Sequence, residues 1–78
     1  MRMELTKEFV EVTETKPFTL TVENGYGIEI ATGSTTPTKN TGKIMSKKDS
    51  IYIQENVKVW VRAIGNDTDK ALISIVGF

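Results

Sequence analysis

The sequence predicts an all-β protein. Of its 78 residues, 26 are Thr, Ile or Val, whose branched Cβ atoms restrict side-chain rotamers in a helix and fit a pleated sheet. Apolar and polar residues alternate along several short runs, and Gly, Asn and Asp stand between these runs. We expect a small antiparallel β-sandwich or barrel-like module of about six to seven short strands, preceded by an extended N-terminal arm.

The first 16 residues fit two patterns. Leu5, Phe9 and Val12 have the spacing of a helical stripe, whereas Val10 and Val12 on either side of Glu11 have the spacing of a strand. We favour an extended arm that runs into a strand. The expected organisation is an N-terminal arm or first strand over 1–16 and a single β domain over 17–78.

Two hairpins are predicted. In the first, Phe18, Leu20 and Val22 alternate with polar residues before Asn24-Gly25, and apolar residues alternate again up to Ile30; Asn-Gly is typical of a tight hairpin turn. Short strands are expected at 43–46 and 50–54, with Asp49 closing the turn between them. The second hairpin joins 57–64 to 70–78 through a turn over 65–69.

The last of these strands, ALISIVGF, is apolar on both faces. A free apolar edge of this kind promotes aggregation, so the strand must be paired or covered. A subunit interface would cover it, and so would a central position in the sheet.

Residues 32–43 (TGSTTPTKNTGK) hold no large apolar side chain. This composition predicts a long loop, and loops of about 12 residues are commonly functional. The loop is therefore the first candidate contact surface, through Thr35, Thr36, Pro37, Lys39 and Asn40.

Trp60 is the most informative single residue. It alternates with the valines of its strand and shares a face with Lys58 and Arg62, so we expect it to be exposed as an interface anchor, or else to pack inside a sandwich. The candidate residues for a partner or oligomer interface are Trp60, Arg62, Tyr52, Leu72, Phe78 and Phe9.

Composition argues against most other functions. The chain has no Cys and no His, which removes the commonest zinc ligands and the residues of a nucleophile–base pair, and we expect no catalysis and no cofactor. Asn66, Asp67 and Asp69 fit a polar turn better than a calcium site, because the Gly and Glu of a calcium loop are missing. A formal net charge of zero argues against nucleic acid and membrane as partners. A core this small commonly needs a partner subunit, so we also expect self-association.

Three segments together carry a resemblance: PFTLTVENGYGIEIATGSTTPT, GKIMSKKDSIYIQ and VKVWVRAIGN, over about residues 17–78. This order resembles the small virion structural proteins of tailed bacteriophages, which include capsid-decoration and fibre-anchoring modules. The strand-and-loop motif of that group falls on residues 28–37, its turn on Asp49 and Ser50, and its Trp strand on 59–63. Lys47-Lys48 stand where such proteins often have Pro-Gly.

The resemblance implies a β-sandwich or barrel-like module, commonly a homotrimer, that binds the major capsid protein or another virion protein. The expected function is that of a non-enzymatic capsid decoration protein, made in the host cytoplasm and located on the capsid surface of the virion. The alternatives are a head-fibre or tail adaptor, and a carbohydrate- or receptor-binding module in which Trp60 or Tyr26 stacks on a sugar ring.

Overall fold

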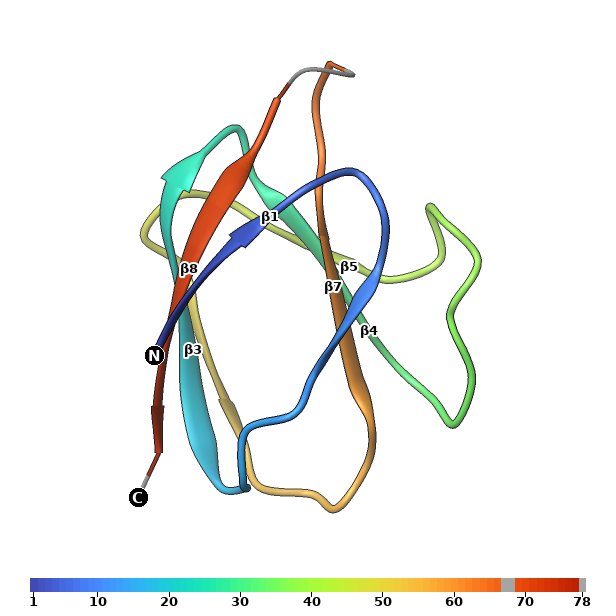
Figure 1. The fold of residues 1–78 in the computed structure, drawn as a ribbon, viewed down its shortest axis with the longest axis vertical. Coiled ribbons are helices and arrows are strands. Elements are labelled where there is room, and N and C mark those ends of the chain that lie inside the picture. Colours follow the sequence, from blue (N-terminus) through green and yellow to red (C-terminus); the bar gives the residue numbers. More distant parts are fainter. Residues whose placement is uncertain (67–68, 78) are drawn as a thin grey trace.

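The computed structural model describes residues 1–66 and 69–77, which form eight strands and no helix. The strands make two four-stranded antiparallel sheets that pack face to face (Figure 1). Sheet 1 has the order β1 (Arg2–Leu5), β8 (Ala71–Gly77), β3 (Phe18–Gly25) and β6 (Ser50–Ile53). Sheet 2 has the order β2 (Val10–Val12), β7 (Val59–Ala63), β4 (Ile28–Thr32) and β5 (Lys43–Met45). The predicted all-β sandwich is confirmed.

The N-terminal segment is extended, as favoured over a helix, and it supplies one strand to each sheet. β1 pairs with β8, and β2 pairs with β7. Leu5 and Val12 are each only 1% exposed. Of the two expected alternatives, an arm or a first strand, the segment thus forms strands of this chain's own sandwich, and it raises the number of strands above the six or seven expected.

The core lies between the sheets and follows the alternation in the sequence. Each long strand turns every second side chain inward, and the fully buried set includes Phe18, Leu20, Val22, Ile28, Val59, Val61, Ala63 and Ile73. Burying one such aliphatic or aromatic side chain contributes about 1.5–3 kcal/mol. The apolar residues that alternate in the sequence thus supply most of the core.

The first predicted hairpin is wrong. β3 pairs with β6 and β8 in sheet 1, whereas β4 pairs with β5 and β7 in sheet 2. Asn24 and Gly25 do not form the turn, because they continue β3 opposite Leu72 and Ala71 after a register shift. The chain crosses between the sheets at Gly25 and Gly27, whose φ angles are +110° and +151°.

The second predicted hairpin is also wrong, since β7 lies in sheet 2 and β8 in sheet 1. β8 is flanked by β1 and β3, so a central position in the sheet, one of the two alternatives, protects this apolar strand. Among the eight described strands, only β4 and β5 are both consecutive in the chain and paired in one sheet. Every other connection crosses from one sheet to the other.

The turn between β5 and β6 is closed by Asp49, as expected. Its Oδ2 accepts a hydrogen bond from the Ser46 backbone N–H at 2.8 Å, and its own N–H donates to the Ser46 carbonyl at 3.0 Å. Lys48 has a positive φ of 75°. In the turn before β8, Asp69 Oδ2 accepts from the Asn66 N–H at 2.6 Å; Asp67 lies outside the described residues.

Candidate functional site: two unlike outer faces

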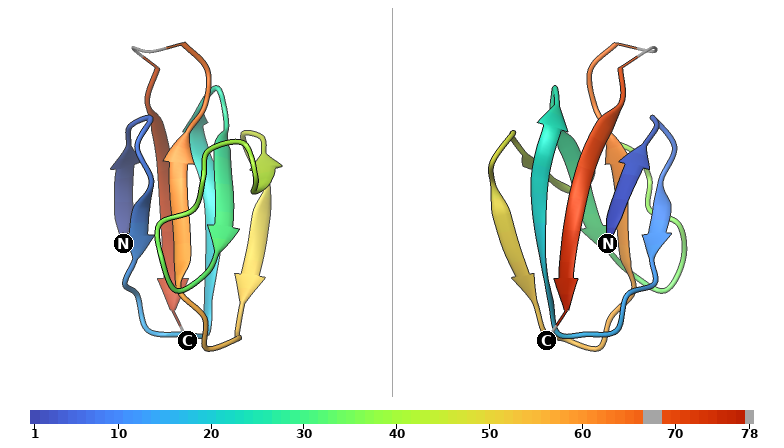
Figure 2. Two further views of the ribbon diagram at one scale, coloured as in Figure 1. Left: turned by 90° about the vertical axis from the view of Figure 1, so that its right-hand side faces the viewer. Right: turned by 60° about the vertical axis from the view of Figure 1, so that its left-hand side comes forward.

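The loop over residues 33–42, between β4 and β5, covers the outer face of sheet 2. In Figure 2, left, it crosses in front of β4 and β7. Its polar composition gives it nothing to contribute to the inter-sheet core, so hydrogen bonds must hold it in place. The side chains beneath it supply them.

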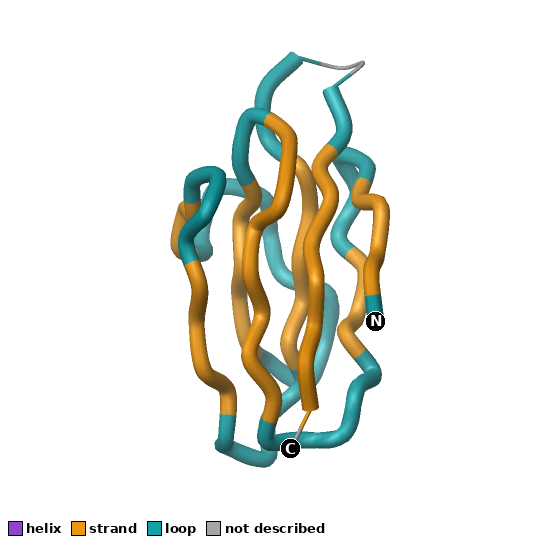
Figure 3. The backbone as a smooth tube through the Cα atoms, turned by 90° about the vertical axis from the view of Figure 1, so that its left-hand side faces the viewer, coloured by secondary structure: helices purple, strands orange, loops and turns teal. Residues whose placement is uncertain are grey.

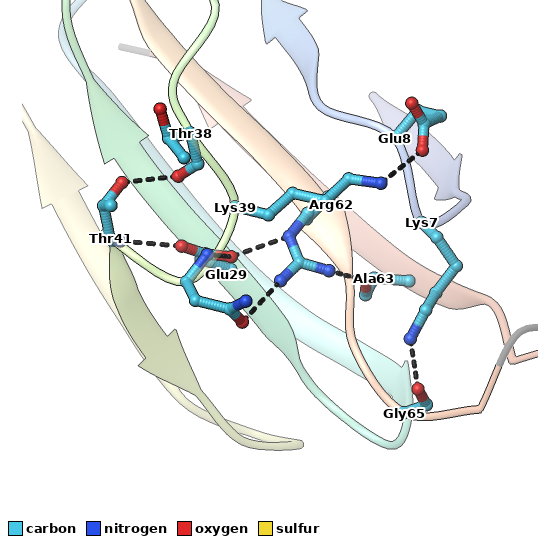
Figure 4. A network of polar contacts seen from close by, with 11 residues as sticks. Lys7, Glu8, Glu29, Thr38, Lys39, Thr41, Arg62, Ala63 and Gly65 are labelled. Atoms are coloured by element: carbon cyan, nitrogen blue, oxygen red, sulfur yellow. Dashed lines mark hydrogen bonds and ion pairs between the residues drawn. The ribbon is translucent and has the colours of Figure 1, made fainter.

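A buried ion pair lies under this loop. Glu29 of β4 and Arg62 of β7 are opposite each other in the ladder and point away from the core, yet they are only 0% and 6% exposed. Arg62 Nε donates to Glu29 Oε1 at 2.6 Å. The Glu29 carboxylate also accepts the backbone N–H groups of Asn40, at 3.0 Å, and Gly42, at 2.6 Å (Figure 4). One carboxylate thus connects two strands to the loop.

Arg62 is satisfied by further groups around it. Its Nη2 donates to Asn40 Oδ1 at 3.2 Å, and its Nη1 donates to the Ala63 carbonyl at 3.4 Å. The guanidinium carbon lies 5.6 Å from the centre of the Phe9 ring, within cation–π range. Among the described residues, no buried side-chain nitrogen or oxygen lacks a hydrogen-bond partner. We call Glu29, Arg62, Asn40 and Gly42 the loop latch.

The latch sets the ionisation of Glu29. Burial on its own raises the pKa of this carboxyl, but the hydrogen bonds from Gly42, Asn40 and Arg62 and the charge of Arg62 outweigh it, and the pKa lies below the usual 4.5. Nearby, the exposed Glu8 forms an ion pair with Lys39 at 2.5 Å. The Lys39 hydrogen bond and charge also lower the pKa of Glu8.

Trp60 lies neither fully exposed on the surface nor inside the sandwich. Its indole is half-buried, and its Nε1–H donates to the Gly33 carbonyl at 2.9 Å. In the ladder Trp60 is opposite Glu11 and Ala31, on the outer face of sheet 2. It therefore lies outside the inter-sheet core and under the start of the loop, where it holds one end while the latch holds the other. Arg62, the neighbouring interface candidate, is 6% exposed because the loop covers it.

The remaining candidate residues lie on both sides of the molecule. Phe9, Lys39 and Asn40 gather around Arg62 on sheet 2, whereas Tyr52 and Leu72 lie on sheet 1. In the loop, Thr35, Thr36, Lys39 and Asn40 are exposed, and Pro37 is half-buried. Phe78 lies outside the described residues.

No loop within residues 1–66 and 69–77 covers the outer face of sheet 1 in this way. The ladders align two rows across β6, β3 and β8: Tyr52, Thr19 and Val76 in one, and Ser50, Thr21 and Ser74 in the other. None of the six is charged, and Val76 is 58% exposed. Thr21 Oγ1 and Ser50 Oγ are 2.7 Å apart, and Ser74 Oγ donates to Glu23 at 2.6 Å. We call these six residues the Ser/Thr face.

Sequence reasoning missed Glu29 altogether. A detectable signal is present, because Glu29 interrupts the apolar Ile28 and Ile30 just as Arg62 interrupts Val61 and Ala63. Two opposite charges, each enclosed by core residues, are the pattern expected of a buried pair.

Comparisons with known proteins identify no relative. No protein-family model, no curated protein and no solved structure matches the chain. Within residues 1–66 and 69–77, no group of three or more acidic, His or Cys side chains is placed to hold a metal ion, and no helix there is long and apolar enough to cross a membrane. The resemblance to phage virion proteins therefore depends on the sequence pattern alone.

Proposed function

We propose that this chain is a non-enzymatic virion structural protein of a tailed bacteriophage, a capsid decoration protein that binds the outer shell and stabilises it. The Ser/Thr face of sheet 1 is the observation that supports this role best. The protein is made in the host cytoplasm and acts on the capsid surface, with the major capsid protein as its partner. The order of sequence segments described above supplies the link to phages.

The Ser/Thr face shares one property with the centre of a protein interface, because its six residues carry no charge. The chain carries 20 charged residues, yet none occurs in the two rows across β6, β3 and β8. Interface centres are depleted in charge, because a charge that loses water without gaining a partner is costly. The loop already covers the outer side of sheet 2, so sheet 1 is the broad surface left for docking.

Decoration needs binding alone, without chemistry. An interface of about 1,200–2,000 Å² in total is typical of stable complexes, and contacts made simultaneously to neighbouring shell subunits would strengthen one another. The shell would then resist expansion because separating its subunits would first require breaking these contacts.

Two surface variants test the docking face. Val76→Glu places a charge on the Ser/Thr face, and Ile44→Glu places the same charge on β5 of sheet 2; the two side chains are 58% and 54% exposed. We expect Val76→Glu to lose binding to capsids that lack the protein, and Ile44→Glu to bind as the native chain does. If both variants bind these capsids as strongly as the native chain does, the Ser/Thr face is excluded as the docking surface.

The function itself is tested on the particle. Phage particles that lack the protein should lose infectivity at a lower temperature than wild type, and adding the purified protein should restore their resistance. Particles that package DNA and resist heat equally well without the protein would refute the decoration role.

Carbohydrate recognition is the second candidate, and one observation favours it. Tyr26, at the crossing from β3 to β4, is 75% exposed, so its ring is available to stack on a sugar. Trp60 is less suited, because its N–H is bonded to Gly33 under the loop. Saturable binding on a glycan array that Tyr26→Ala abolishes, with the fold intact, would favour this function over decoration.

A further inference from the structure

β6 is an edge strand without the usual protection. It ends sheet 1, and no strand of the described part of the chain lies beyond its outer side (Figures 2 and 3). Proteins commonly place charge or Pro on such edges to prevent pairing with other chains. The other three edge strands carry charge: Arg2 and Glu4 in β1, Glu11 in β2 and Lys43 in β5. β6, with the sequence SIYI, has neither charge nor Pro.

The backbone of β6 has bonding groups directed outward. The Val22 N–H donates to the Asp49 carbonyl at 2.9 Å, so Asp49 faces β3 just before β6 begins. The groups of an antiparallel strand alternate between its two sides. Ser50, the next residue, therefore directs its N–H and C=O toward the free edge, where they can form hydrogen bonds with the backbone of another strand.

A largely apolar groove lies beside this edge, between the two sheets. It has a volume of about 410 Å³, and its walls combine the apolar Ile30, Ala31, Pro37, Ile51 and Ile53 with the polar Thr32, Thr41 and Lys43. The groove exists because β5 begins late: its first residue, Lys43, lies opposite Ile30 of β4. The loop precedes Lys43, so Ala31 and Thr32 of β4 have no β5 partner.

We propose that β6 pairs antiparallel with β6 of a second copy of this chain across a two-fold axis. A two-fold axis perpendicular to the sheet keeps the inner sides of both copies facing the same way, so Ile51 lies beside the partner's Ile51. The two copies of sheet 1 become one continuous sheet. The inward Ile side chains of each copy then enter the groove of the other. This inference does not depend on the proposed function.

The charges at the two ends of β6 favour this second copy as the occupant. Lys47 and Lys48 precede the strand, and Glu55 follows it closely. Antiparallel pairing brings the lysine end of each copy beside the partner's Glu55, and the two-fold axis produces this contact twice. A copy of the same edge is thus complementary to itself in both shape and charge.

The contact is small. Four strand residues and their flanks bury less than the roughly 1,200–2,000 Å² of a typical stable complex, so we expect a reversible dimer. Its mass of about 17 kDa, twice 8.7 kDa, also separates it from the trimer that the phage resemblance implies.

The experiment is sedimentation of the purified chain over a dilution series, with three variants. Ser50→Lys puts a charge on the free edge. Thr21→Lys is the matched control, since it puts the same charge on the same face and breaks the same Thr21–Ser50 hydrogen bond, but on the central strand β3. Glu55→Lys replaces the attraction to the partner's lysines with repulsion. Circular dichroism establishes that each variant is folded.

We expect the native chain and Thr21→Lys to dimerise as concentration rises. Ser50→Lys should remain monomeric at the highest concentration, and Glu55→Lys should need at least tenfold more protein to reach the same dimer fraction. A native chain that stays monomeric, or that forms a trimer, overturns the proposal. So does a folded Thr21→Lys that fails to dimerise, because the contact would then use the Ser/Thr face instead of the edge.

Discussion

Replacing Glu29 by Gln tests the loop latch directly. The Glu29 carboxylate accepts three hydrogen bonds, from the Asn40 N–H, the Gly42 N–H and Arg62 Nε. A glutamine side chain offers one acceptor oxygen and an NH₂ group that is itself a donor. At least one of the three donors must then face another donor, and the buried Arg62 loses its counter-charge.

The expected loss of stability is about 3 kcal/mol. Removing one partner of a buried ion pair costs about 3–5 kcal/mol, and we take the lower end because glutamine keeps one acceptor. A chain of 78 residues has a free energy of unfolding of about 4–12 kcal/mol, at roughly 0.05–0.15 kcal/mol per residue. At about 4–8 °C per kcal/mol for a domain of this size, Glu29→Gln should lower the melting temperature by about 12–24 °C.

Urea unfolding followed by Trp60 fluorescence measures this loss, because the indole lies under the loop. Amide hydrogen exchange at Asn40 and Gly42 should accelerate beyond the global change, since these two N–H groups bind the carboxylate. Glu8→Gln is the matched control: Glu8 pairs with Lys39 in an exposed ion pair, and its loss should change stability little.

A loss below about 1 kcal/mol for Glu29→Gln would refute the reasoning, because it would be no larger than the loss of an ordinary hydrogen bond. The double variant Glu29→Gln/Arg62→Met separates charge from packing. Removing both charges should recover part of the stability lost in Glu29→Gln, since no unpaired charge then remains buried. Further loss in the double variant would show that the guanidinium stabilises the loop without needing its counter-charge.

Three further predictions concern single groups. The pKa of Glu29 is lower in the folded chain than its usual 4.5. The contribution of its carboxylate to stability is therefore fully present above pH 4.5 and is lost as the pH falls through the folded pKa. In a pH series of urea unfolding, the free energies of unfolding of the native and Glu29→Gln chains should converge in acid. Gly25→Ala should lower the free energy of unfolding by more than about 2 kcal/mol, because φ is +110° and the new Cβ would lie 2.6 Å from the Lys70 carbonyl oxygen. Gly77→Ala is the control: open space surrounds its Cβ, so this variant should unfold in urea as the native chain does. Trp60→Phe should lose about 1 kcal/mol with its bond to Gly33, and an unchanged melting temperature would contradict the indole's role in holding the loop.

The sequence pattern predicted local structure well. Alternation located most strands and their buried sides, because the period of two is a local property of an extended chain. The loop over 32–43 was predicted from its lack of large apolar residues, and the structure places it over residues 33–42.

The division of strands between the sheets was not predictable in the same way. Asn24-Gly25 satisfies the local rule for a hairpin, yet Gly25 lies opposite Ala71, 46 positions further along the chain. Both β3 and β4 bury alternate side chains whether they share a sheet or face each other across the core, so the pattern fits either arrangement. The latch escaped prediction for a related reason, because Glu29 meets Arg62 only through the register of β4 and β7.

The alternation of consecutive strands between the two sheets has a consequence for how the chain folds. β1 pairs with β8, and the N-terminal amino group of Met1 donates to the Ile75 carbonyl at 2.8 Å, so the first and last strands are neighbours. Chains dominated by such distant pairings fold slowly, in about milliseconds to seconds, because long loops must close before any contact compensates for the lost entropy. During synthesis on a ribosome, sheet 1 could not be completed until β8 had emerged.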